Sequence, residues 1–579
     1  MRFIFSYLKP QSAMIVFILF IKIVGSLGEL LLPYVLEHLI DNVAPEGKAL
    51  PVVLWGLVMI ALAVVVRWLN VAANRRTVKL ASQATYQVRR DLFAASLRLS
   101  GHQMDELGLP SIISRMTSDS YNVQSFIQSI FSAGVRAPIR LLGGIAITMV
   151  MDTGLSLILV ILAPIMIAAV VGVSLKGIPL YERVQQSVDT IVRVMRENIV
   201  GIRVVKALSK EKYERRRFDE ANETMIRREK TAGIVMALPG PIMMLAMNVG
   251  LTVVVIVGAY RVNAGVTEPG VILAFLTYFN MILMGVMGIN RVFMQMSKAN
   301  ASSARIRKVI DQVDELPTLP ETEGAECPSG DYIVFDHVSF LYDAVPGHTN
   351  RRELSLDDIS FRMPKGASLG IIGPTGCGKT TVINLLMRFY EAGSGHIFVD
   401  GKDVRCYDKQ ELRRHFGVVF QNDMIFADTV AENVAFGRSV SREEIERALR
   451  DASAADFVAE KEGGLDEMAD IHGANFSGGQ RQRLLIARAL VDHPDILVLD
   501  DSSSALDYRT DAAVRRAVRE NYAGITTITV AQRVSSVMGM DEILVLDEGR
   551  VIGHGRHEEL LESCEKYRRI YENQMGEVE

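Results

Sequence analysis

The first half of the chain is dominated by long apolar stretches. Residues 153–175, 231–260 and 269–290 contain no charged residue. At a rise of about 1.5 Å per residue, each is long enough to cross a bilayer core of about 30 Å as a helix. No comparable stretch recurs after about residue 316, where charged residues are dense. The pattern predicts six membrane-spanning helices, at residues 12–35, 49–73, 131–151, 155–175, 231–260 and 269–296.

Two long polar connections lie between these spans. Residues 74–130 and 176–230 have helical periodicity and almost no Pro or Gly breaks, so we expect spans two to five to continue as helices beyond the membrane. The chain is predicted to turn near residues 107–111 and 208–212. Both connections are rich in Lys and Arg, which places them and both termini in the cytoplasm. The expected location is the cell membrane, as a multi-pass protein of a bacterial inner membrane.

The second half of the chain has a different pattern. Residues 316–330 are rich in Pro, Gly and Glu and are interpreted as a linker. Beyond them, short strand-like runs alternate with helical ones, which predicts an α/β domain with a largely parallel core sheet. The expected organisation is an all-α membrane domain at 1–315, a linker at 316–330 and an α/β domain at 331–579.

Composition narrows the classes of function. A formal net charge of −4 gives no basis for binding nucleic acid through bulk charge. The four cysteines all lie in the C-terminal half without a CxxC pair, so we expect reduced thiols and neither a disulfide framework nor a zinc site. The N-terminus lacks a short apolar region followed by a small-residue cleavage site, so no removable signal peptide is predicted.

A phosphate-binding loop is predicted at residues 373–380, GPTGCGKT, between the strand ASLGII and the helix TTVINLLMRF. Glycines let such a loop curl so that its N–H groups face phosphates, while Lys379 reaches the β and γ phosphates and Thr380 helps to hold Mg²⁺. The alternative is a chance glycine-rich turn, against which the flanking strand and helix argue. The ATP ligands expected in this segment are Gly373, Pro374, Thr375, Gly376, Cys377, Gly378, Lys379, Thr380 and Thr381.

Three more residues are candidates for the same site. Asp500 ends the strand ILVLD, where a carboxylate for Mg²⁺ is expected. Gln421 follows the strand GVVF. Tyr342 precedes the strand of the phosphate loop, where an aromatic ring either stacks on adenine or is simply packed, and both interpretations stay open. The predicted Mg²⁺ ligands are Thr380, Gln421 and Asp500.

In order and spacing, these motifs resemble the nucleotide-binding domain of ABC transporters. GPTGCGKT, Gln421, FSGGQRQRLLIARAL and ILVLDDSSSALD carry the resemblance, and the spans ahead of them resemble the exporter type, with one membrane domain fused to one ATPase domain. The resemblance implies a P-loop ATPase fold with a helical subdomain bearing the signature FSGGQ, and a γ-phosphate-sensing role for Gln421. It also implies that two ATPase domains pair head to tail. In such a pair, the signature residues Ser477, Gly478, Gly479 and Gln480 bind ATP held by the partner's P-loop. A helix cap is the other role that Ser477 can have.

The sequence departs from the family pattern at three positions. Asp501 stands where ABC ATPases carry the Glu that orients the attacking water, and Gln532 stands where they carry a His. Ile471 replaces a Glu that exporters often have, in the loop that contacts the crossing coupling helix. Asp501 and Gln532 are therefore predicted to be degenerate catalytic positions, because Asp is shorter than Glu and Gln carries no imidazolium charge. With NFSGGQ and VRAP, the exchanges most resemble the degenerate half of bacterial heterodimeric multidrug exporters.

The expected function is one half of an ATP-driven exporter, paired with a second chain that carries Glu and His at the matching positions. Its cargo is expected to be small amphipathic or drug-like molecules, lipids or peptides, with membrane lipid as a further partner and no nucleic acid. Hydrolysis is expected mainly at the partner's P-loop. The alternatives are a slow homodimer, a siderophore importer with exporter architecture, and a nucleotide-gated channel or regulatory subunit. The six spans disfavour a soluble ABC ATPase of DNA maintenance.

Charged residues within or beside the spans are functional candidates, because ionisable groups are costly in a bilayer. Some of them can instead lie at the membrane interface. Arg136 and Arg140 are four residues apart in span three, so we expect one shared helix face that points to a partner helix or an aqueous cavity. The set is Lys22, Glu29, Arg67, Arg136, Arg140 and Arg291.

Overall fold

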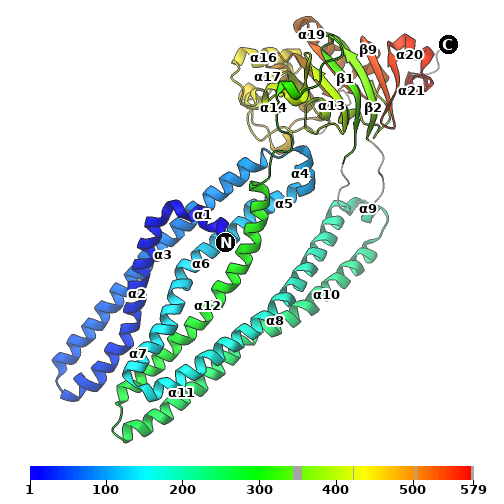
Figure 1. Ribbon diagram of the computed structural model, residues 1–579. Helices are drawn as coiled ribbons and strands as arrows, with labels where there is room; N and C mark the ends of the chain where they lie inside the picture. Colours follow the sequence, from blue (N-terminus) through cyan, green and yellow to red (C-terminus); the bar gives the residue numbers. More distant parts are fainter. Residues whose placement is uncertain (343–354, 422, 503–504, 576–579) are drawn as a thin grey trace. The chain divides into compact units, whose positions relative to one another are not determined.

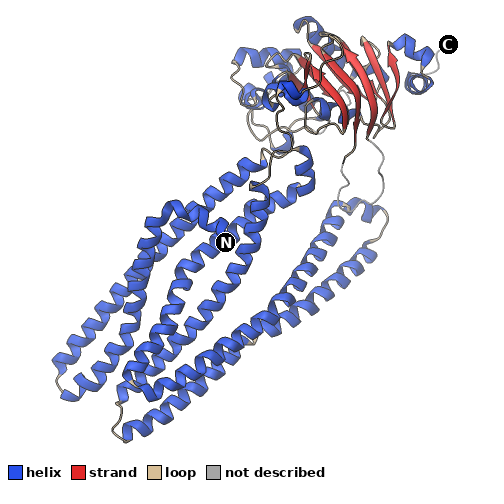
Figure 2. Cartoon of the chain, in the orientation of Figure 1, coloured by secondary structure: helices blue, strands red, loops and turns tan. Residues whose placement is uncertain are grey.

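The computed structural model describes residues 1–342, 355–421, 423–502 and 505–575 and divides into two compact units. The helical unit comprises Met1–Leu97 and Pro110–Gln312. The α/β unit comprises Val313–Glu579 together with the short segment Arg98–Leu109. All described strands belong to the α/β unit (Figure 2). This confirms the predicted fold class, an all-helical N-terminal region followed by an α/β domain.

Long helices make up the helical unit (Figure 1). Within the described residues, six helical segments are long and apolar enough to span a membrane, which confirms the number of spans predicted from the sequence. They are formed by α2 (Ser12–His38), α3 (Ala49–Ser96), α6 (Ser120–Pro138) with α7 (Gly144–Met151), α8 (Thr153–Val200), α10 (Glu211–Ala237) with α11 (Pro239–Asn263), and α12 (Pro269–Ile310).

Two aspartates cap the starts of spanning helices. Asp152 Oδ1 accepts hydrogen bonds from the N–H groups of Gly154 and Leu155, at 2.8 and 3.0 Å, and so caps the start of α8. The Asp41 carboxylate accepts from the N–H groups of Gly270 and Val271, at 2.6 and 3.1 Å, at the start of α12. Carboxylates at a helix N-terminus accept hydrogen bonds from otherwise unpaired N–H groups and interact favourably with the positive end of the helix dipole.

Several helices run far beyond the apolar part of their sequence, as predicted. α3 continues to Ser96 and α8 to Val200. The chain then turns at Gly108 (φ 72°), between α4 (Gly101–Leu107) and α5 (Leu109–Ser114). It turns again at Ser209 (φ 51°), after α9 (Ile202–Ala207). Both turns fall at the predicted places.

The two arginines of span three contact neighbouring helices. Arg136 Nη2 donates to Asn70 Oδ1 of α3 at 2.8 Å. Arg140 Nη2 donates to Glu29 Oε1 of α2 at 2.6 Å. The expectation that both guanidinium groups turn towards protein partners is confirmed.

The larger sheet of the α/β unit has the strand order β10-β9-β3-β8-β7-β6. All pairs are parallel except the β9–β10 hairpin, which confirms the predicted parallel core sheet. The hairpin turns at Glu548 (φ 47°) and Gly549 (φ 78°), two left-handed residues typical of a tight two-residue turn. The strands are β3 (Ser368–Ile372), β6 (Phe416–Val419), β7 (Ile496–Asp500), β8 (Thr526–Ala531), β9 (Glu542–Asp547) and β10 (Arg550–Gly555).

A second, antiparallel sheet has the order β2-β1-β4-β5. Its strands are β1 (Ile333–Phe340), β2 (Leu356–Met363), β4 (Ser394–Val399) and β5 (Lys402–Asp403). The core between the two sheets contains the apolar residues of α13 (Lys379–Leu386). A second core lies around α18 (Gly478–Leu490) and α19 (Tyr508–Asn521).

The short helix α4 packs on the α/β unit, to which it belongs by its contacts. The N–H of Gly101 donates to Phe389 O at 3.3 Å, and Tyr390 Oη donates to Asp105 Oδ2 at 2.6 Å. At its start, Ser100 Oγ donates to Glu315 Oε2 at 2.8 Å. The chain enters and leaves the α/β unit within these few residues.

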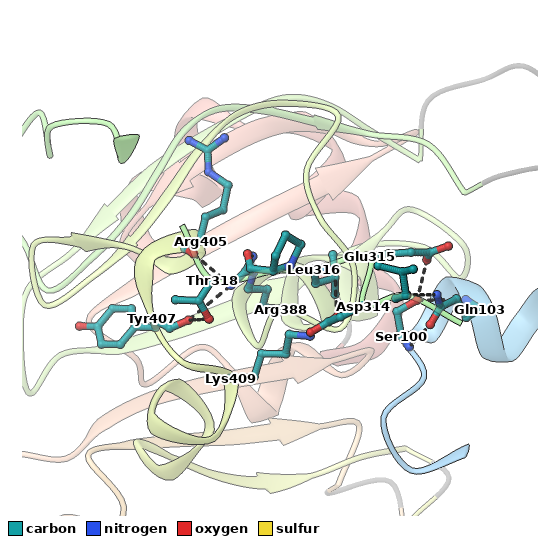
Figure 3. A network of polar contacts seen from close by, with 12 residues as sticks. Ser100, Gln103, Asp314, Glu315, Leu316, Thr318, Arg388, Arg405, Tyr407 and Lys409 are labelled. Atoms are coloured by element: carbon teal, nitrogen blue, oxygen red, sulfur yellow. Dashed lines mark hydrogen bonds and ion pairs between the residues drawn. The ribbon is translucent and has the colours of Figure 1, made fainter. Parts of the chain in front are cut away.

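The segment after α12 is tied to the α/β unit rather than loose (Figure 3). Arg388, at the end of α13, is 1% exposed and donates to Pro317 O at 2.8 Å. The same guanidinium donates to the carbonyls of Arg405 and Tyr407, at 3.1 and 3.4 Å. Lys409 pairs with Asp314 at 2.5 Å. Arg388 therefore joins the helix of the phosphate loop to the segment that follows α12.

Candidate nucleotide-binding site

The glycine-rich loop connects β3 to α13 and takes the curled form predicted for it. Gly376 and Gly378 have φ values of 85° and 100°, which favour glycine. A Cβ on Gly378 would lie 2.8 Å from Ser355 O, and a Cβ on Gly373 would lie 2.1 Å from Leu546 O. The loop therefore needs glycine for both its conformation and its close packing on β2 and β9.

Lys379 lies folded over the loop. Its Nζ donates to the carbonyl oxygens of Gly373 and Pro374, at 2.8 Å each, and the side chain is largely buried. These bonds hold the ammonium group within the curl of the loop. A phosphate bound there would meet a cation that is already positioned, so little ordering cost remains for Lys379 on binding.

Thr380 and Asp500 form the oxygen-rich side of the site. Thr380 Oγ1 donates to Asp500 Oδ2 at 3.0 Å, and Asp500 is 1% exposed at the end of β7. Burial raises the pKa of the Asp500 carboxyl, while the Thr380 hydrogen bond opposes that shift. Hydroxyl and carboxylate oxygens are the ligands that Mg²⁺ prefers, so the pair fits the predicted ion.

Asp501 is held by two glutamines. Asp501 Oδ2 accepts from Gln421 Nε2 at 3.2 Å and from Gln532 Nε2 at 3.0 Å. Its backbone is left-handed, with φ 51°, a conformation that Asp tolerates better than most residues. The structure thus brings together three residues that come from the ends of β6, β7 and β8. Residues 503–504 of the motif ILVLDDSSSALD, which spans residues 496–507, lie outside the described residues.

These groups surround one cavity of about 1060 Å³, which is large enough for a nucleotide. Its wall includes Lys379, Thr380, Gln421, Asp500 and Asp501. Further residues of the wall are Tyr342, Ser355, Asp357, Thr375, Gly376, Gly378, Thr381, Gln532, Asp547, Glu548, Gly549 and Arg550.

Comparisons with known proteins identify both parts of the chain. The family model described as "ABC transporter transmembrane region" matches residues 15–287, and the model described as "ABC transporter" matches residues 356–504. The uncharacterized ABC transporter ATP-binding protein YfiB of Bacillus subtilis is 32% identical, over 99% of this chain and 98% of its own length. The chain belongs to the ABC transporter family.

Other similar proteins agree with this assignment. The ATP-dependent lipid A-core flippase of Vibrio vulnificus is 31% identical to this ABC transporter, over 85% of this chain and 83% of its own. A solved bacterial Atm1-family ABC exporter with ATP bound superposes with a TM-score of 0.80. That structure covers 98% of this chain and 99% of its own at 24% identity, so the likeness shows the shared exporter fold. The family implies that the cavity binds ATP, with Mg²⁺.

Tyr342 both borders the cavity and packs against its neighbours. Its hydroxyl donates to Thr381 Oγ1 at 3.4 Å and accepts from Asn384 Nδ2 at 3.2 Å. The ring meets Phe340 and Tyr390 edge-on. The packed interpretation is confirmed by these contacts, and adenine stacking by Tyr342 stays a prediction.

The signature residues of this ABC transporter subunit do not line its own cavity. Ser477 caps α18: its Oγ accepts from the N–H of Gln480 at 3.3 Å, and Gln480 Oε1 accepts from the N–H of Ser477 at 2.9 Å. Ser477 and Gly478 are exposed at the start of this helix of 13 residues. Such a helix start presents unpaired N–H groups to an anion.

Cys377 differs from the other loop residues. Its side chain is 4% exposed and lies in the core, with Sγ 3.8 Å from Lys379 Nζ. Burial raises the pKa of the thiol, against the effect of Lys379. Cys377 is absent from the cavity wall, so its predicted role as an ATP ligand stays a prediction.

Sequence reasoning missed one part of the wall, which is formed by the β9–β10 hairpin and β2. Arg550 Nε donates to Asp357 Oδ2 at 2.8 Å, and both residues line the cavity. The run EILVLDEGRVIG shows strand-like residues around a Glu-Gly pair, so the turn is visible in the sequence. Its place beside the phosphate loop depends on the parallel pairing of β3 with β9, which the sequence does not reveal.

Proposed function

We propose that this chain is one half of an ATP-driven exporter and pairs with a second, different subunit that carries Glu and His where this chain has Asp501 and Gln532. The P-loop of this chain holds ATP with little turnover. Hydrolysis takes place mainly where the partner's P-loop meets the signature residues Ser477–Gln480. The protein lies in the cell membrane with both termini and the α/β unit in the cytoplasm, as the Lys- and Arg-rich connections support.

The observation that carries this proposal is the pair of hydrogen bonds to Asp501. A residue that orients an attacking water needs a free carboxylate oxygen next to the γ-phosphate. Asp501 Oδ2 already accepts from Gln421 and Gln532, and its side chain is one methylene shorter than Glu. A displacement of about 1 Å in such a group can lower a rate about 100-fold. The groups expected to bind the nucleotide, Lys379, Thr380 and Asp500, line the same cavity as Asp501 and support binding of ATP by this chain.

The intact signature supports an active role at the partner's site. FSGGQ is complete, and the start of α18 is exposed and not engaged with this chain's own cavity. A chain that had lost all ATPase function would have no need of this complete anion-binding helix start. We infer that the cargo is amphipathic, as the resemblance to multidrug exporters implies. The printed name of the Vibrio relative, a lipid A-core flippase, is compatible with such cargo.

Two variants separate the roles of the two sites in the complete transporter. Lys379→Ala removes the phosphate-binding cation from this chain's site and should slow ATP turnover without eliminating it. Ser477→Arg places a bulky cation at the start of α18 and should nearly abolish turnover, because it damages the partner's competent site. Steady-state phosphate release from the purified complex measures both. Equal losses in the two variants would contradict the asymmetric assignment and favour a slow homodimer.

A further inference from the structure

A side chain of the last helix in Figure 1, α21 (Glu565–Met575), is bonded to the backbone beside the nucleotide cavity. Gln574 Nε2 donates to Gln532 O at 2.8 Å, and Gln574 Oε1 accepts from the N–H of Val534 at 2.8 Å. Gln532 belongs to the cavity wall, and its side chain donates to Asp501. A helix far along the chain from the phosphate loop therefore contacts the segment that carries one of the two degenerate positions.

The two bonds of Gln574 begin where the ladder of β8 ends. The pairing of β8 with β3 ends at Ala531, and its pairing with β7 ends at Val530. The Gln574 amide bonds on both sides of Arg533, as a residue of a neighbouring strand does in a parallel sheet. The side chain thus continues the pairing of β8 past its last partner. This requires a donor and an acceptor on one group, which an amide has and an ionised carboxylate lacks.

The docking of α21 has a separate basis. Tyr567 is fully buried and belongs to the same apolar core as Ile372 and Ala531, the last residues of β3 and β8. Gln574 itself is exposed. Burial of an aromatic side chain stabilises more than two exposed hydrogen bonds do, so Tyr567 holds the helix in place. The bonds of Gln574 therefore act mainly on the segment that they contact.

The turn that follows this segment is held from another helix. Arg515 of α19 donates from Nη1 to Ser535 O at 3.3 Å and to Ser536 O at 2.8 Å. These bonds do not involve α21. Replacement of Gln574 should therefore loosen residues 532–534 and leave the turn after them in place.

The amide of Gln532 has a second donor to offer. Its NH2 group carries two hydrogens, and the bond to Asp501 Oδ2, at 3.0 Å, uses one of them. The other can donate to an oxygen of a γ-phosphate, and hydrogen bonds to charged oxygens are the stronger kind. ADP has no such oxygen. The direction of this donor depends on the backbone of Gln532, which Gln574 holds.

We propose that Gln574 is a positioning residue for the γ-phosphate end of the cavity. It fixes the backbone of residues 532–534, aims the amide of Gln532, and so sets the preference of this chain's site for ATP over ADP. Its effect passes through Gln532, because the described residues of the cavity wall include Gln532 and not Gln574. The inference rests on the proposed function, in which the P-loop of this chain holds ATP.

The test measures how well ATP and ADP protect this chain from a photolabel. The complete transporter is mixed on ice with 8-azido-ATP labelled in its α-phosphate and with rising ATP or ADP, then irradiated, and the chains are separated. Gln574→Met keeps a similar length without the amide. We expect the ratio of the ADP to the ATP inhibition constant to fall about five- to tenfold, through weaker ATP binding with ADP unchanged.

A second variant at this position separates the two bonds. Gln574→Glu keeps an acceptor for the N–H of Val534 but places a carboxylate against Gln532 O. The ratio should fall at least as far as in Gln574→Met. An unchanged ratio in both variants would overturn the proposal.

A double-variant cycle tests the route through Gln532. Gln532→Ala should lower the ratio by itself, and Gln574→Met added to it should lower the ratio no further, because the two residues act in series. Additive effects would overturn the assignment. Asn573→Met makes a comparable change at the preceding exposed residue of α21 and is the matched control, which should leave the ratio unchanged. A fall in the control as large as in Gln574→Met would also count against Gln574.

Amide hydrogen exchange distinguishes positioning from damage to the fold. In Gln574→Met, residues 532–534 should exchange faster while residues 565–573 keep their original rates. Faster exchange in both segments would show that Gln574 docks the helix, and would overturn its positioning role.

The photolabel also separates this inference from the proposed function. If the original chain takes up no label that ATP competes away, the proposed function fails and the role of Gln574 fails with it. If the chain is labelled and prefers ATP, but Gln574→Met keeps that preference, the role of Gln574 is wrong and the proposed function stands.

Discussion

At the scale of single residues, the proposed asymmetry rests on Asp501. Its Oδ2 accepts hydrogen bonds from Gln421 and Gln532. The two exchanged residues, Asp501 and Gln532, are therefore hydrogen-bonded to each other where an attacking water would need a general base. Replacing Asp501→Glu and Gln532→His together should lengthen the carboxylate and remove one of the amide donors. We expect hydrolysis by this chain's site to rise about 10- to 100-fold.

The measurement is phosphate release by complexes in which the partner's P-loop lysine has been replaced, so that only this site turns over. Asp492→Glu makes the same chemical change at an exposed position after α18 and serves as the control. An unchanged rate in the double variant would show that these two positions do not limit hydrolysis at this site.

Cys377 offers a second test at this scale. The thiol is buried, and burial raises its pKa, so the reactive thiolate is scarce at neutral pH and increases as the pH rises towards that raised value. Alkylation by iodoacetamide at pH 7 should therefore be at least about tenfold slower at Cys377 than at the partly exposed Cys327. Mass spectrometry of the labelled peptides gives both rates. We expect Mg-ATP to slow Cys377 further, because a filled loop opens less often, and faster labelling of Cys377 than of Cys327 would contradict its burial.

At the scale of elements, hydrogen bonds join the end of α13 to the segment after α12. Arg388→Met removes hydrogen bonds from a buried guanidinium group to three carbonyl groups, so it should destabilise the α/β unit by roughly 2–4 kcal/mol. Lys409→Met breaks a partly exposed ion pair with Asp314 and should cost about 1 kcal/mol or less. Denaturant unfolding ranks the two variants, and limited proteolysis should cut residues 313–320 faster in Arg388→Met. The reverse ranking would show that the buried arginine does not hold this segment.

The docking of α4 gives the other prediction for elements. A Cβ on Gly101 would lie 2.7 Å from Cζ of Tyr390, whose hydroxyl donates to Asp105. Gly101→Ala should therefore displace α4 from Tyr390 and lower the stability of this contact by roughly 1–3 kcal/mol. Amide hydrogen exchange in residues 98–109 should become faster. Gly539→Ala, which meets no atom within 4 Å, is the matched control and should leave that exchange unchanged. Unchanged exchange in both variants would contradict the close contact at Gly101.

The elements themselves could mostly be predicted from the sequence. The apolar stretches gave the spans, and the turns near Gly108 and Ser209 followed from where helical periodicity breaks. The phosphate loop could be placed because its strand, glycines and lysine are contiguous. The assignment of residues 98–109 to the α/β unit was not predicted, because it depends on contacts between Gly101 and Phe389 that are distant in sequence. The hydrogen bonds of Asp501 depend likewise on three strand ends that meet only in the folded sheet.

At the scale of the whole molecule, two features suit an asymmetric dimer. Lys379, Thr380 and Asp500 line the cavity of this chain, while its signature residues lie outside that cavity, with Ser477 and Gly478 exposed. In the family's head-to-tail arrangement each chain contributes to two sites, so the proposed loss of catalysis at Asp501 and Gln532 would affect one site only.

The fate of the nucleotide bound to this chain tests the central claim most directly. The complete transporter is allowed to turn over azido-ATP labelled in its γ-phosphate, then irradiated, and the two chains are separated. We predict that γ-label persists on this chain after many turnovers of the complex and is lost from the partner. Loss of γ-label from both chains at the same rate, or hydrolysis at about 10 per second or more by this chain alone, would contradict the account.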